Sequence, residues 1–324
     1  MKAAWYTKNG SARDVLVVGE MPTPEPGPGE VRVRVHASGV NPSDVKSRVR
    51  RPLDSDRIVP HSDGAGTLEK VGPGVERRLG ERVWIWNGQW ERALGTAAQF
   101  IVVPQQQAVP MPSSLSFEEG ACLGIPALTA IEAIRLAGNL RGQTVLVTGA
   151  GNAVGHYVTQ LAARAGAQVI GTAGNEERKA HALAAGASHV IDYKQDKVGE
   201  RLSAMTRGQG VDLIIDMDFS GTSALLPQKV LRPHGRLICY GSNSTAPAPV
   251  DFRTLLWSSL EIKCFLVYDL QAQARREGLS GLSDLLETRA LQHTVAARFP
   301  LEEIAAAHEM VEAGRKIGTV VVTV

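Results

Sequence analysis

The chain has 324 residues, of which 44% are hydrophobic and 21% charged, and its formal net charge is +2. This length fits about two globular domains, and the composition excludes a chain that is disordered or fibrous over most of its length. The arginine pairs 50–51, 77–78 and 275–276 are scattered instead of forming one basic stripe, so nucleic acid is not the expected partner.

The three cysteines, Cys122, Cys239 and Cys264, lie far apart in apolar surroundings. This pattern is typical of reduced thiols in an intracellular protein and excludes a disulfide framework. The N-terminal residues show no charged leader followed by an apolar core, and no window approaches 18 uncharged apolar residues. We therefore expect a cytoplasmic protein that does not associate with a membrane.

The first hundred residues have the periodicity of β-strands. Prolines and glycines alternate over residues 22–29 and predict an extended turn. Residues 30–40 then alternate, with Val31, Val33 and Val35 on one face, which predicts a half-buried antiparallel strand. Shorter strands are predicted at 82–86 and 97–103. Together they indicate a compact, β-rich, barrel-like unit.

From about residue 123 strands and helices alternate with short connections. Strands are predicted at 144–148, 168–172, 190–192, 211–216 and 236–240, and helices at 127–137, 153–164, 176–185, 196–206 and 222–231. Strands that alternate with helices of this length are typical of a parallel sheet covered on both faces. The sequence therefore predicts a doubly wound α/β domain.

The C-terminal part is predicted to contain a helix at 269–277, a second helical stretch through 287, a helix at 301–313 and a strand at 318–324. The last strand, with valines at 320–322, needs a sheet to join. We expect it to return to the N-terminal unit.

One motif points to chemistry. The strand at 144–148 leads into a glycine-containing loop, 149–155, and then into an amphipathic helix. A pyrophosphate needs the backbone N–H groups of a helix N-terminus with no side chain in its way, and Gly149 and Gly151 permit the tight turn and the close approach. Gly155 lets the helix pack closely on the strand. The spacing is one residue longer than the plain dinucleotide fingerprint, so the strand before and the helix after carry the assignment.

The loop predicts a dinucleotide site, with a helix cap that merely tolerates glycines as the alternative. The residues expected at the cofactor are Gly149, Ala150, Gly151, Asn152, Ala153 and Val154.

The second strand of the α/β domain indicates which dinucleotide binds. Residues 169–175 contain no acid that would hold a ribose 2′-hydroxyl, and Glu176 and Glu177 fit the first turn of the next helix. Arg178 and Lys179 follow and would reach a 2′-phosphate, unless they are simply solvated helix residues. We therefore predict NADPH, and place Gly174, Asn175 and Arg178 at this end of the cofactor.

Four segments carry a family resemblance. Residues 40–44 (VNPSD), 60–66 (PHSDGAG), 145–155 and 314–324 resemble the zinc-free, zeta-crystallin-like quinone oxidoreductases of the medium-chain dehydrogenase/reductase superfamily. The resemblance spans essentially the whole chain. It implies a GroES-like catalytic domain at 1–123 and 267–324, a Rossmann NADPH-binding domain at 124–266, and ligands in the cleft between them.

The resemblance also bears on metal. Zinc-dependent relatives carry a cysteine where Asn41 stands and a Gly-His-Glu triplet that aligns with residues 61–63, here His-Ser-Asp. The four close cysteines of their structural zinc lobe are absent as well. Because zinc requires converging N or S donors, the resemblance implies a reductase without a metal.

Carried over by motif, Asn41 and Asp44 line the substrate pocket, and Thr129 lies near the nicotinamide. Each has a structural alternative. The segment that begins at Asn41 is also a common turn initiator, Asp44 fits a helix cap, and Thr129 fits an ordinary helix residue. Tyr193 matches a tyrosine near the 2′-phosphate, with a sheet-edge aromatic as the alternative.

The turn of Gly241 and Ser242 matches a family turn at the carboxyl ends of the strands, where ligands bind in such sheets. Three features depart from the family. Asn152 replaces a glycine, and we expect it to tolerate a left-handed backbone. Residues 216–219 replace a glycine-rich turn beside the cofactor. Tryptophans 84, 86 and 90 are typical of barrel core, although residues 88–90 fall in a segment that borders the family's active site.

The expected reaction is hydride transfer from C4 of NADPH to a quinone or an electron-poor enone, with Asn41 and Thr129 as uncharged groups that polarise the acceptor oxygen. One alternative is reduction of an alkenal or enoyl double bond on the same scaffold. Another is a regulatory or structural protein that binds NADPH without catalysis. The resemblance also suggests a homodimer, through sheet-edge pairing along residues 260–267.

Overall fold

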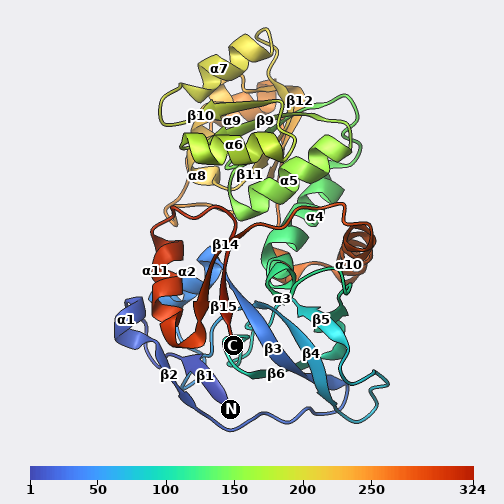
Figure 1. The fold of residues 1–324 in the computed structure, drawn as a ribbon. Helices are drawn as coiled ribbons and strands as arrows, with labels where there is room; N and C mark the ends of the chain where they lie inside the picture. The colour runs from blue at the N-terminus through green and yellow to red at the C-terminus, as the bar shows by residue number, and fades with distance from the viewer. The chain divides into compact units, whose positions relative to one another are not determined.

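The computed structural model describes residues 1–324 and divides into two compact units (Figure 1). Unit 1 comprises Met1–Ala127 and Ser283–Val324, and unit 2 comprises Leu128–Leu282. Unit 1 is therefore discontinuous in sequence, whereas unit 2 is one uninterrupted segment. The boundaries expected from the sequence, after residues 123 and 266, lie earlier in the chain at both places. The second boundary of the structure falls within a helix.

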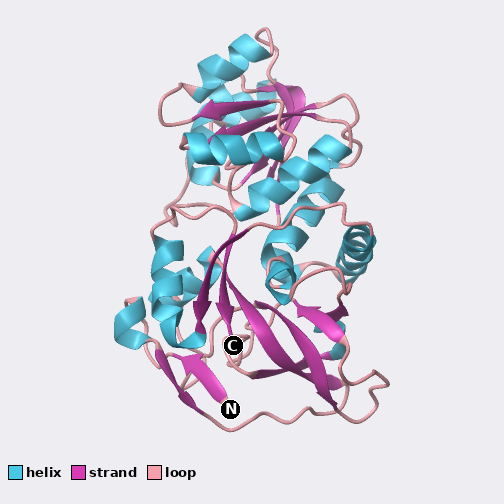
Figure 2. Ribbon diagram, viewed as in Figure 1, coloured by secondary structure: helices cyan, strands magenta, loops and turns pink.

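Unit 1 is built on a seven-stranded sheet in the order β14-β15-β3-β4-β5-β7, with β6 also paired to β3 (Figure 2). Its strands, together with a separate hairpin of β1 and β2, are β1 (Lys2–Trp5), β2 (Val17–Glu20), β3 (Glu30–Val40), β4 (Asp63–Val71), β5 (Arg82–Ile85), β6 (Phe100–Pro104), β7 (Ala108–Pro110), β14 (Val295–Pro300) and β15 (Thr319–Thr323). The alternating valines of β3 are buried, as their period of two predicts. β15 pairs antiparallel with β3, which confirms the return of the last strand to the N-terminal unit.

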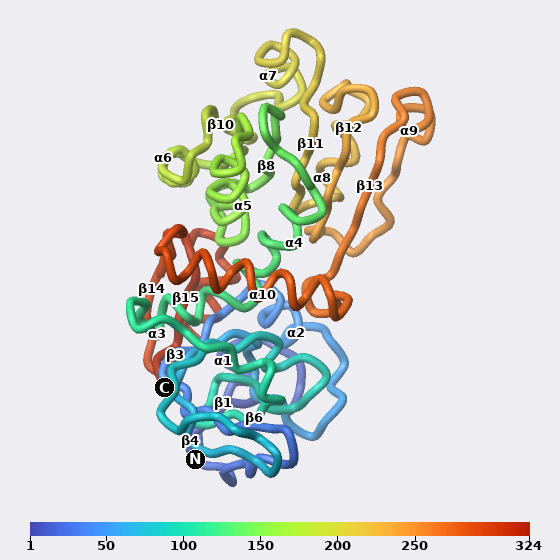
Figure 3. Tube along the Cα trace, turned by 90° about the vertical axis from the view of Figure 1, so that its right-hand side faces the viewer, coloured from blue at the N-terminus to red at the C-terminus, as the bar shows by residue number.

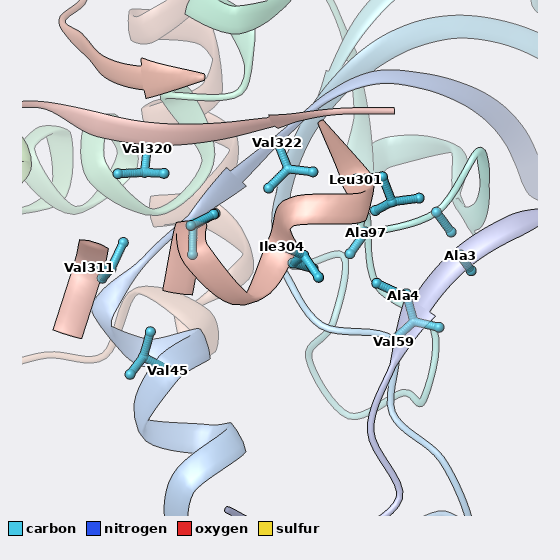
Figure 4. Close-up of a cluster of buried hydrophobic side chains, with 13 residues drawn as sticks. Ala3, Ala4, Val45, Val59, Ala97, Leu301, Ile304, Val311, Val320 and Val322 are labelled. Atoms are coloured by element: carbon cyan, nitrogen blue, oxygen red, sulfur yellow. The ribbon is translucent and has the colours of Figure 1, made fainter. Parts of the chain in front are cut away.

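The helices of unit 1 are α1 (Ala12–Val15), α2 (Pro42–Arg50), α3 (Phe117–Gly120) and α11 (Ile304–Glu312), and Leu123–Ala127 forms a π-helical turn. Side chains from both ends of the chain form one buried cluster (Figure 4). Val45 of α2, Ile304 and Val311 of α11, and Val320 and Val322 of β15 all lie in it. The C-terminal segment is thus part of the core of unit 1, because its apolar side chains have no other place out of water.

Unit 2 contains a six-stranded parallel sheet in the order β10-β9-β8-β11-β12-β13. Its strands are β8 (Thr144–Val147), β9 (Gln168–Ala173), β10 (His189–Asp192), β11 (Val211–Asp216), β12 (Leu231–Cys239) and β13 (Glu261–Cys264). Its helices are α4 (Leu128–Ala137), α5 (Ala153–Arg164), α6 (Glu176–Ala184), α7 (Val198–Met205), α8 (Phe219–Thr222), α9 (Phe252–Trp257) and α10 (Ala272–Glu287), which crosses the unit boundary. This confirms the doubly wound α/β fold. The order of the strands changes direction between β8 and β11: β9 and β10 follow on one side of β8, and β11, β12 and β13 follow on the other.

Two predicted elements differ in the structure. The helix predicted at 222–231 is wrong: only the short α8 and a 3-10 segment, Ser223–Gln228, form there, and β12 starts at Leu231. Pro227 lacks the N–H that a longer helix needs, and Lys229 takes a left-handed conformation with φ 57°. The two helical stretches predicted at 269–287 are the single helix α10. No helix in either unit has the length and apolar character needed to cross a bilayer.

Candidate functional site

A cavity of about 260 Å³ opens at the carboxyl ends of the parallel strands of unit 2. Residues that follow β8 and β11 line it. It therefore lies at the point where the strand order changes direction, which is where ligands bind in sheets of this kind. The lining residues are Leu146, Thr148, Gly149, Gly151, Asn152, Thr172, Ala173, Gly174, Arg178, Tyr193, Val198, Met217, Asp218, Gly221, Thr222, Leu225 and Asn243.

The glycine turn leaves no space for side chains. Gly149 has φ +63°, and a Cβ built on it would lie 2.2 Å from the sulfur of Met217. A Cβ on Gly151 would lie 2.6 Å from the backbone oxygen of Arg178, and one on Gly155 would lie 2.2 Å from that of Gly149. A side chain at Gly151 or Gly155 would displace backbone, and one at Gly149 would displace the Met217 side chain and strain a backbone with positive φ. The turn therefore exposes bare backbone at the N-terminus of α5, whose first N–H groups have no partner within the helix and are suited to a phosphate.

The end of β9 holds this turn in place. The backbone N–H of Gly149 donates to the Thr172 hydroxyl and that of Ala150 to the Thr172 carbonyl, each at 3.0 Å. Asn152 precedes α5 in an extended conformation with φ −90°, so the turn does not need the left-handed backbone that asparagine was expected to tolerate. Its side chain instead turns toward Met217, with Nδ2 3.0 Å from the sulfur. Asparagine replaces glycine here without strain because the position does not require a positive φ.

Arg178 and Tyr193 lie on the same cavity. Arg178 is in the first turn of α6, where its backbone N–H donates to the side-chain oxygen of Asn175 at 2.9 Å. The Tyr193 side chain is 48% exposed and lies directly against Gly174, where an added Cβ would come 2.6 Å from its hydroxyl. Lys179 does not line the cavity and instead pairs with Glu176 at 3.3 Å. Arg178 is thus the one lysine or arginine that lines this cavity.

Half of the residues predicted for the cofactor line the cavity, namely Gly149, Gly151, Asn152, Gly174, Arg178 and Tyr193. The others, which do not line it, are Ala150, Ala153, Val154, Asn175, Gly241 and Ser242. Ala150 is fully buried, and Asn175 serves as the N-cap of α6. Ala153 and Val154 open α5 beside the turn.

Sequence reasoning missed several lining residues, including Thr172, Asp218 and Asn243. All three lie at or beyond the carboxyl end of a parallel strand, and this position was the available signal. Asp216 fixes the turn after β11, because its Oδ1 accepts hydrogen bonds from the hydroxyls of Thr148 and Thr222, each at 2.7 Å, and from the Asp218 backbone at 3.1 Å. Burial raises the pKa of Asp216 above its ordinary value.

Asn41 and Asp44 belong to a buried polar cluster in unit 1. The backbone N–H of Asn41 donates to Asp44 Oδ2 at 2.7 Å, and Asn41 Nδ2 donates to Asp63 Oδ2 at 2.8 Å. The Ile125 N–H, from the π-helical turn, donates to both oxygens of Asp63 at 2.9 Å. A Cβ on Gly124 would lie 2.1 Å from Asp63 Oδ1, so this glycine is what lets the turn close on the carboxylate. The Asn41 amide is therefore held in one orientation.

Burial dominates the electrostatics of this cluster. Asp44 is 4% exposed, and burial raises its pKa from 3.8 to about 7, although hydrogen bonds from Asn41 and Ser62 act in the opposite direction. Burial likewise raises the pKa of Asp63 well above its ordinary value. The contacts of Asp44 are those of a helix cap, since its carboxylate serves the start of α2.

A directed chain of hydrogen bonds runs beside this cluster. Arg48 Nε donates to His308 Nδ1 at 3.3 Å, and the Nε2 atoms of His308 and His61 lie 2.9 Å apart. Because arginine can only donate, His308 carries its proton on Nε2 and donates to His61. His61 then carries its proton on Nδ1 and donates to the Ser38 hydroxyl at 2.8 Å. Burial lowers the pKa of His61 to about 3 and that of His308 well below its ordinary value, so both rings are neutral.

The remaining predicted residues belong to different units. Thr129 lies in the first turn of α4 in unit 2 and is 3% exposed, whereas Asn41 and Asp44 belong to unit 1. Trp84 is fully buried in the sheet of unit 1, in agreement with a core role. Trp86 Nε1 donates to the Gln106 carbonyl at 3.1 Å, and the Arg51 guanidinium lies 5.0 Å from the Trp90 ring centre. No group of three or more His, Cys, Asp or Glu side chains is placed to hold a metal ion.

Comparisons with known proteins agree with both units. The alcohol dehydrogenase GroES-like domain matches residues 27–113, and the zinc-binding dehydrogenase domain matches residues 153–285. Quinone oxidoreductase of Mus musculus is 30% identical over 322 residues, covering 95% of this chain and 93% of the relative. 2-Haloacrylate reductase of Burkholderia sp. is 30% identical over 334 residues, covering 99% and 98%. The crystal structure of Escherichia coli quinone oxidoreductase complexed with NADPH superposes with a TM-score of 0.90 at 26% identity, covering both chains completely.

Proposed function

The chain belongs to the quinone oxidoreductases of the medium-chain dehydrogenase/reductase superfamily, and on that basis we propose that it is an NADPH-dependent reductase of a quinone or a related electron-poor enone. The observation that carries the proposal is the cavity of unit 2, where the bare glycine turn at the N-terminus of α5 and the side chain of Arg178 line one space. A pyrophosphate fits the first, and a 2′-phosphate fits the second.

When bound, NADPH supplies the hydride. The residues of the chain have the simpler tasks of holding the cofactor and polarising the acceptor. Gly149 and Gly151 admit the diphosphate, and Arg178 pairs with the 2′-phosphate. The E. coli relative was solved with NADPH, which agrees with this assignment.

Asn41 is the group we assign to the acceptor oxygen, with Thr129 as the second candidate. One N–H of the Asn41 amide donates to Asp63, and Asp63 is held in turn by Ile125. The Asn41 side chain also hydrogen-bonds with the Asp44 carboxyl, so both acids of this cluster hold the amide in place. Because the amide is already fixed, donation to an oxygen that gains negative charge requires little reorganisation. Asp44 then serves as a positioning residue at the start of α2.

We further propose that the reaction proceeds without zinc. Asn41 stands where zinc-dependent relatives have a cysteine, and an amide nitrogen is not a zinc donor. The two ring nitrogens of His61 contact Ser38 and His308, and both oxygens of Asp63 accept N–H groups. The atoms near Asn41 that could coordinate a metal, those of His61 and Asp63, therefore already take part in hydrogen bonds.

The experiment is a titration of the purified chain with NADPH and NADH, followed by turnover with a quinone and an enone. We expect tighter binding of NADPH and oxidation of NADPH in the presence of an acceptor. Arg178→Ala weakens NADPH binding by about tenfold or more and leaves NADH nearly unchanged, because the lost contact is a charge-assisted hydrogen bond. Equal losses for both cofactors, or wild-type protein that binds neither, would contradict the proposal.

The similarity to 2-haloacrylate reductase favours a second candidate, reduction of a conjugated carbon–carbon double bond. A panel of quinones, alkenals, enoyl thioesters and 2-haloacrylates separates the two by their relative kcat/KM. Binding of NADPH without turnover of any acceptor would support the non-catalytic alternative instead.

We propose that the protein works as a homodimer in the cytoplasm. β13 is an edge strand of the sheet in unit 2, with α9 beside it (Figure 3). The α9 side chains of Phe252, Leu256 and Trp257 are 71%, 62% and 77% exposed, which is unusual for large apolar residues unless a second copy covers them. The three cysteines are free, as expected in a reducing compartment.

A further inference from the structure

Lys194 lies beside one end of the cavity of unit 2. The last residue of β10 pairs with the last residue of β9, and the backbone N–H of Tyr193 donates to the carbonyl of Ala173 at 3.1 Å. The segment that leaves β10 therefore runs alongside the segment that leaves β9, where Gly174 lines the cavity. Lys194 is the second residue of the first segment, so the register of the two strands sets its position.

The Lys194 side chain folds back over Gly174. A Cβ built on Gly174 would lie 3.1 Å from Cε of Lys194 and 2.6 Å from the hydroxyl of Tyr193. Because glycine has no side chain, the aliphatic part of the lysine can lie against bare backbone while its charged end stays in water. The ammonium group, which is bonded to Cε, is thus held at the edge of the cavity and not within its lining.

The ammonium of Lys194 has no partner within the protein. Ion pairs are formed by four other lysines, namely Lys2, Lys70, Lys179 and Lys197. The one hydrogen bond that Lys194 donates locally comes from its backbone N–H, which reaches Asp192 Oδ1 at 2.9 Å. The side chain is exposed, so all three donors of the ammonium group are available to a ligand.

The charges at this end of the cavity leave room for a second cation. A phosphate monoester carries a charge of about −1.5 to −2 at neutral pH, whereas Arg178 supplies a single positive charge. Glu176 and Glu177 lie in the same helical turn as Arg178, and only Glu176 is paired, with Lys179. Arg178 alone would therefore leave a bound 2′-phosphate incompletely neutralised. A second positive group within reach would lower the free energy of the bound state.

We propose that Lys194 is a specificity-determining residue whose ammonium group binds the 2′-phosphate of the cofactor together with Arg178, an inference that rests on the proposed function. Arg178 reaches the phosphate from α6 and Lys194 from the segment after β10, so two separate elements hold it. The contribution of Lys194 is confined to NADPH, because NADH has an uncharged hydroxyl at the same position.

The test compares the binding of NADPH and NADH, which differ only in the 2′-phosphate, by calorimetry at one low ionic strength. The proteins are the wild-type chain, Lys194→Gln, Lys194→Arg and Lys197→Gln. Lys197→Gln is a matched control, because it removes the same charge three residues away from a side chain that is 80% exposed, is paired with Glu200 and does not line the cavity. Lys194 is exposed, so its variants are expected to fold, and equal melting temperatures check this.

We expect Lys194→Gln to weaken NADPH binding by about fivefold, the size of a good exposed charge pair, and to leave NADH binding within about twofold. Lys194→Arg should keep most of the NADPH affinity, and Lys197→Gln should change neither cofactor. A wild-type preference for NADPH that is unchanged in Lys194→Gln, or lost equally in Lys197→Gln, would overturn the assignment of Lys194 and leave the proposed function standing. A wild-type chain that binds both cofactors equally would refute the proposed choice of NADPH, and the role of Lys194 with it.

Discussion

Replacing Asp44 by asparagine should change how the stability of unit 1 depends on pH. Asparagine has nearly the same shape and keeps an oxygen for the backbone N–H of Asn41, but it cannot ionise. Burial raises the pKa of Asp44 from 3.8 to about 7. A carboxyl with a higher pKa in the folded state stabilises the protein most below its unfolded pKa, and that contribution is lost as the pH rises through about 4 to 7.

The magnitude follows from the size of the shift. Each pKa unit corresponds to about 1.4 kcal/mol, so between pH 5 and pH 8 the wild-type chain should lose about 3 kcal/mol relative to Asp44→Asn. His61 acts in the opposite direction, because burial lowers its pKa to about 3 in the folded state. Its contribution to the free energy of unfolding therefore rises with pH until the pH passes the pKa of histidine in the unfolded chain. The wild-type curve alone is therefore flattened, and the difference between the two proteins isolates Asp44.

The assay is urea unfolding at several pH values between 5 and 8. Four of the five tryptophans lie in unit 1, and Trp257 lies in unit 2. In a Trp257→Phe background, fluorescence therefore reports on unit 1 alone. Asp56→Asn, an exposed acid of the same unit, is the control and should run parallel to the wild type. Parallel curves for Asp44→Asn as well would refute the argument that burial controls this carboxyl.

Three further predictions concern the cofactor, the acceptor and the assembly. Gly151→Ala should weaken NADPH binding by about tenfold or more in calorimetry, because its Cβ would lie 2.6 Å from the Arg178 carbonyl, whereas Gly281→Ala, with nothing within 4 Å, should bind normally. Asn41→Ala should lower kcat by about tenfold or more while the Kd for NADPH stays within about twofold, and a change confined to the Kd would remove Asn41 from the acceptor site. Leu256→Asp should convert a dimer into a monomer in light scattering, and a wild-type monomer would show that α9 has another role.

Local signals were sufficient to predict much of the fold. The alternating valines of β3 identify a half-buried strand, and the strands and helices after residue 123 identify a parallel sheet, because each pattern follows from the geometry of one element. The helix predicted at 222–231 was wrong because Pro227 and the left-handed Lys229 outweigh the apolar spacing there.

The site was less accessible to sequence reasoning. Gly149, Gly151 and Arg178 lie within two consecutive strand-helix units, so their meeting on one cavity follows from a local motif. Asp218 reaches that cavity from a more distant strand. In unit 1, the contact between His61 and His308 joins residues 247 positions apart, and the contact between Asn41 and Asp63 depends on how α2 meets the sheet. Contacts of this kind are set by tertiary packing and leave no periodicity in the sequence.

The position of β15 has a consequence for how the protein is made. This strand is not at an edge of its sheet, since it lies between β14 and β3, yet it is synthesised after β3 and after all of unit 2. Unit 2 is contiguous and can fold while synthesis continues, whereas the nascent sheet of unit 1 must wait with an open gap beside β3. A chain cut before β15 would leave that gap permanently, so unit 1 would stay incomplete beside a folded unit 2 and would be exposed to chaperones and proteases.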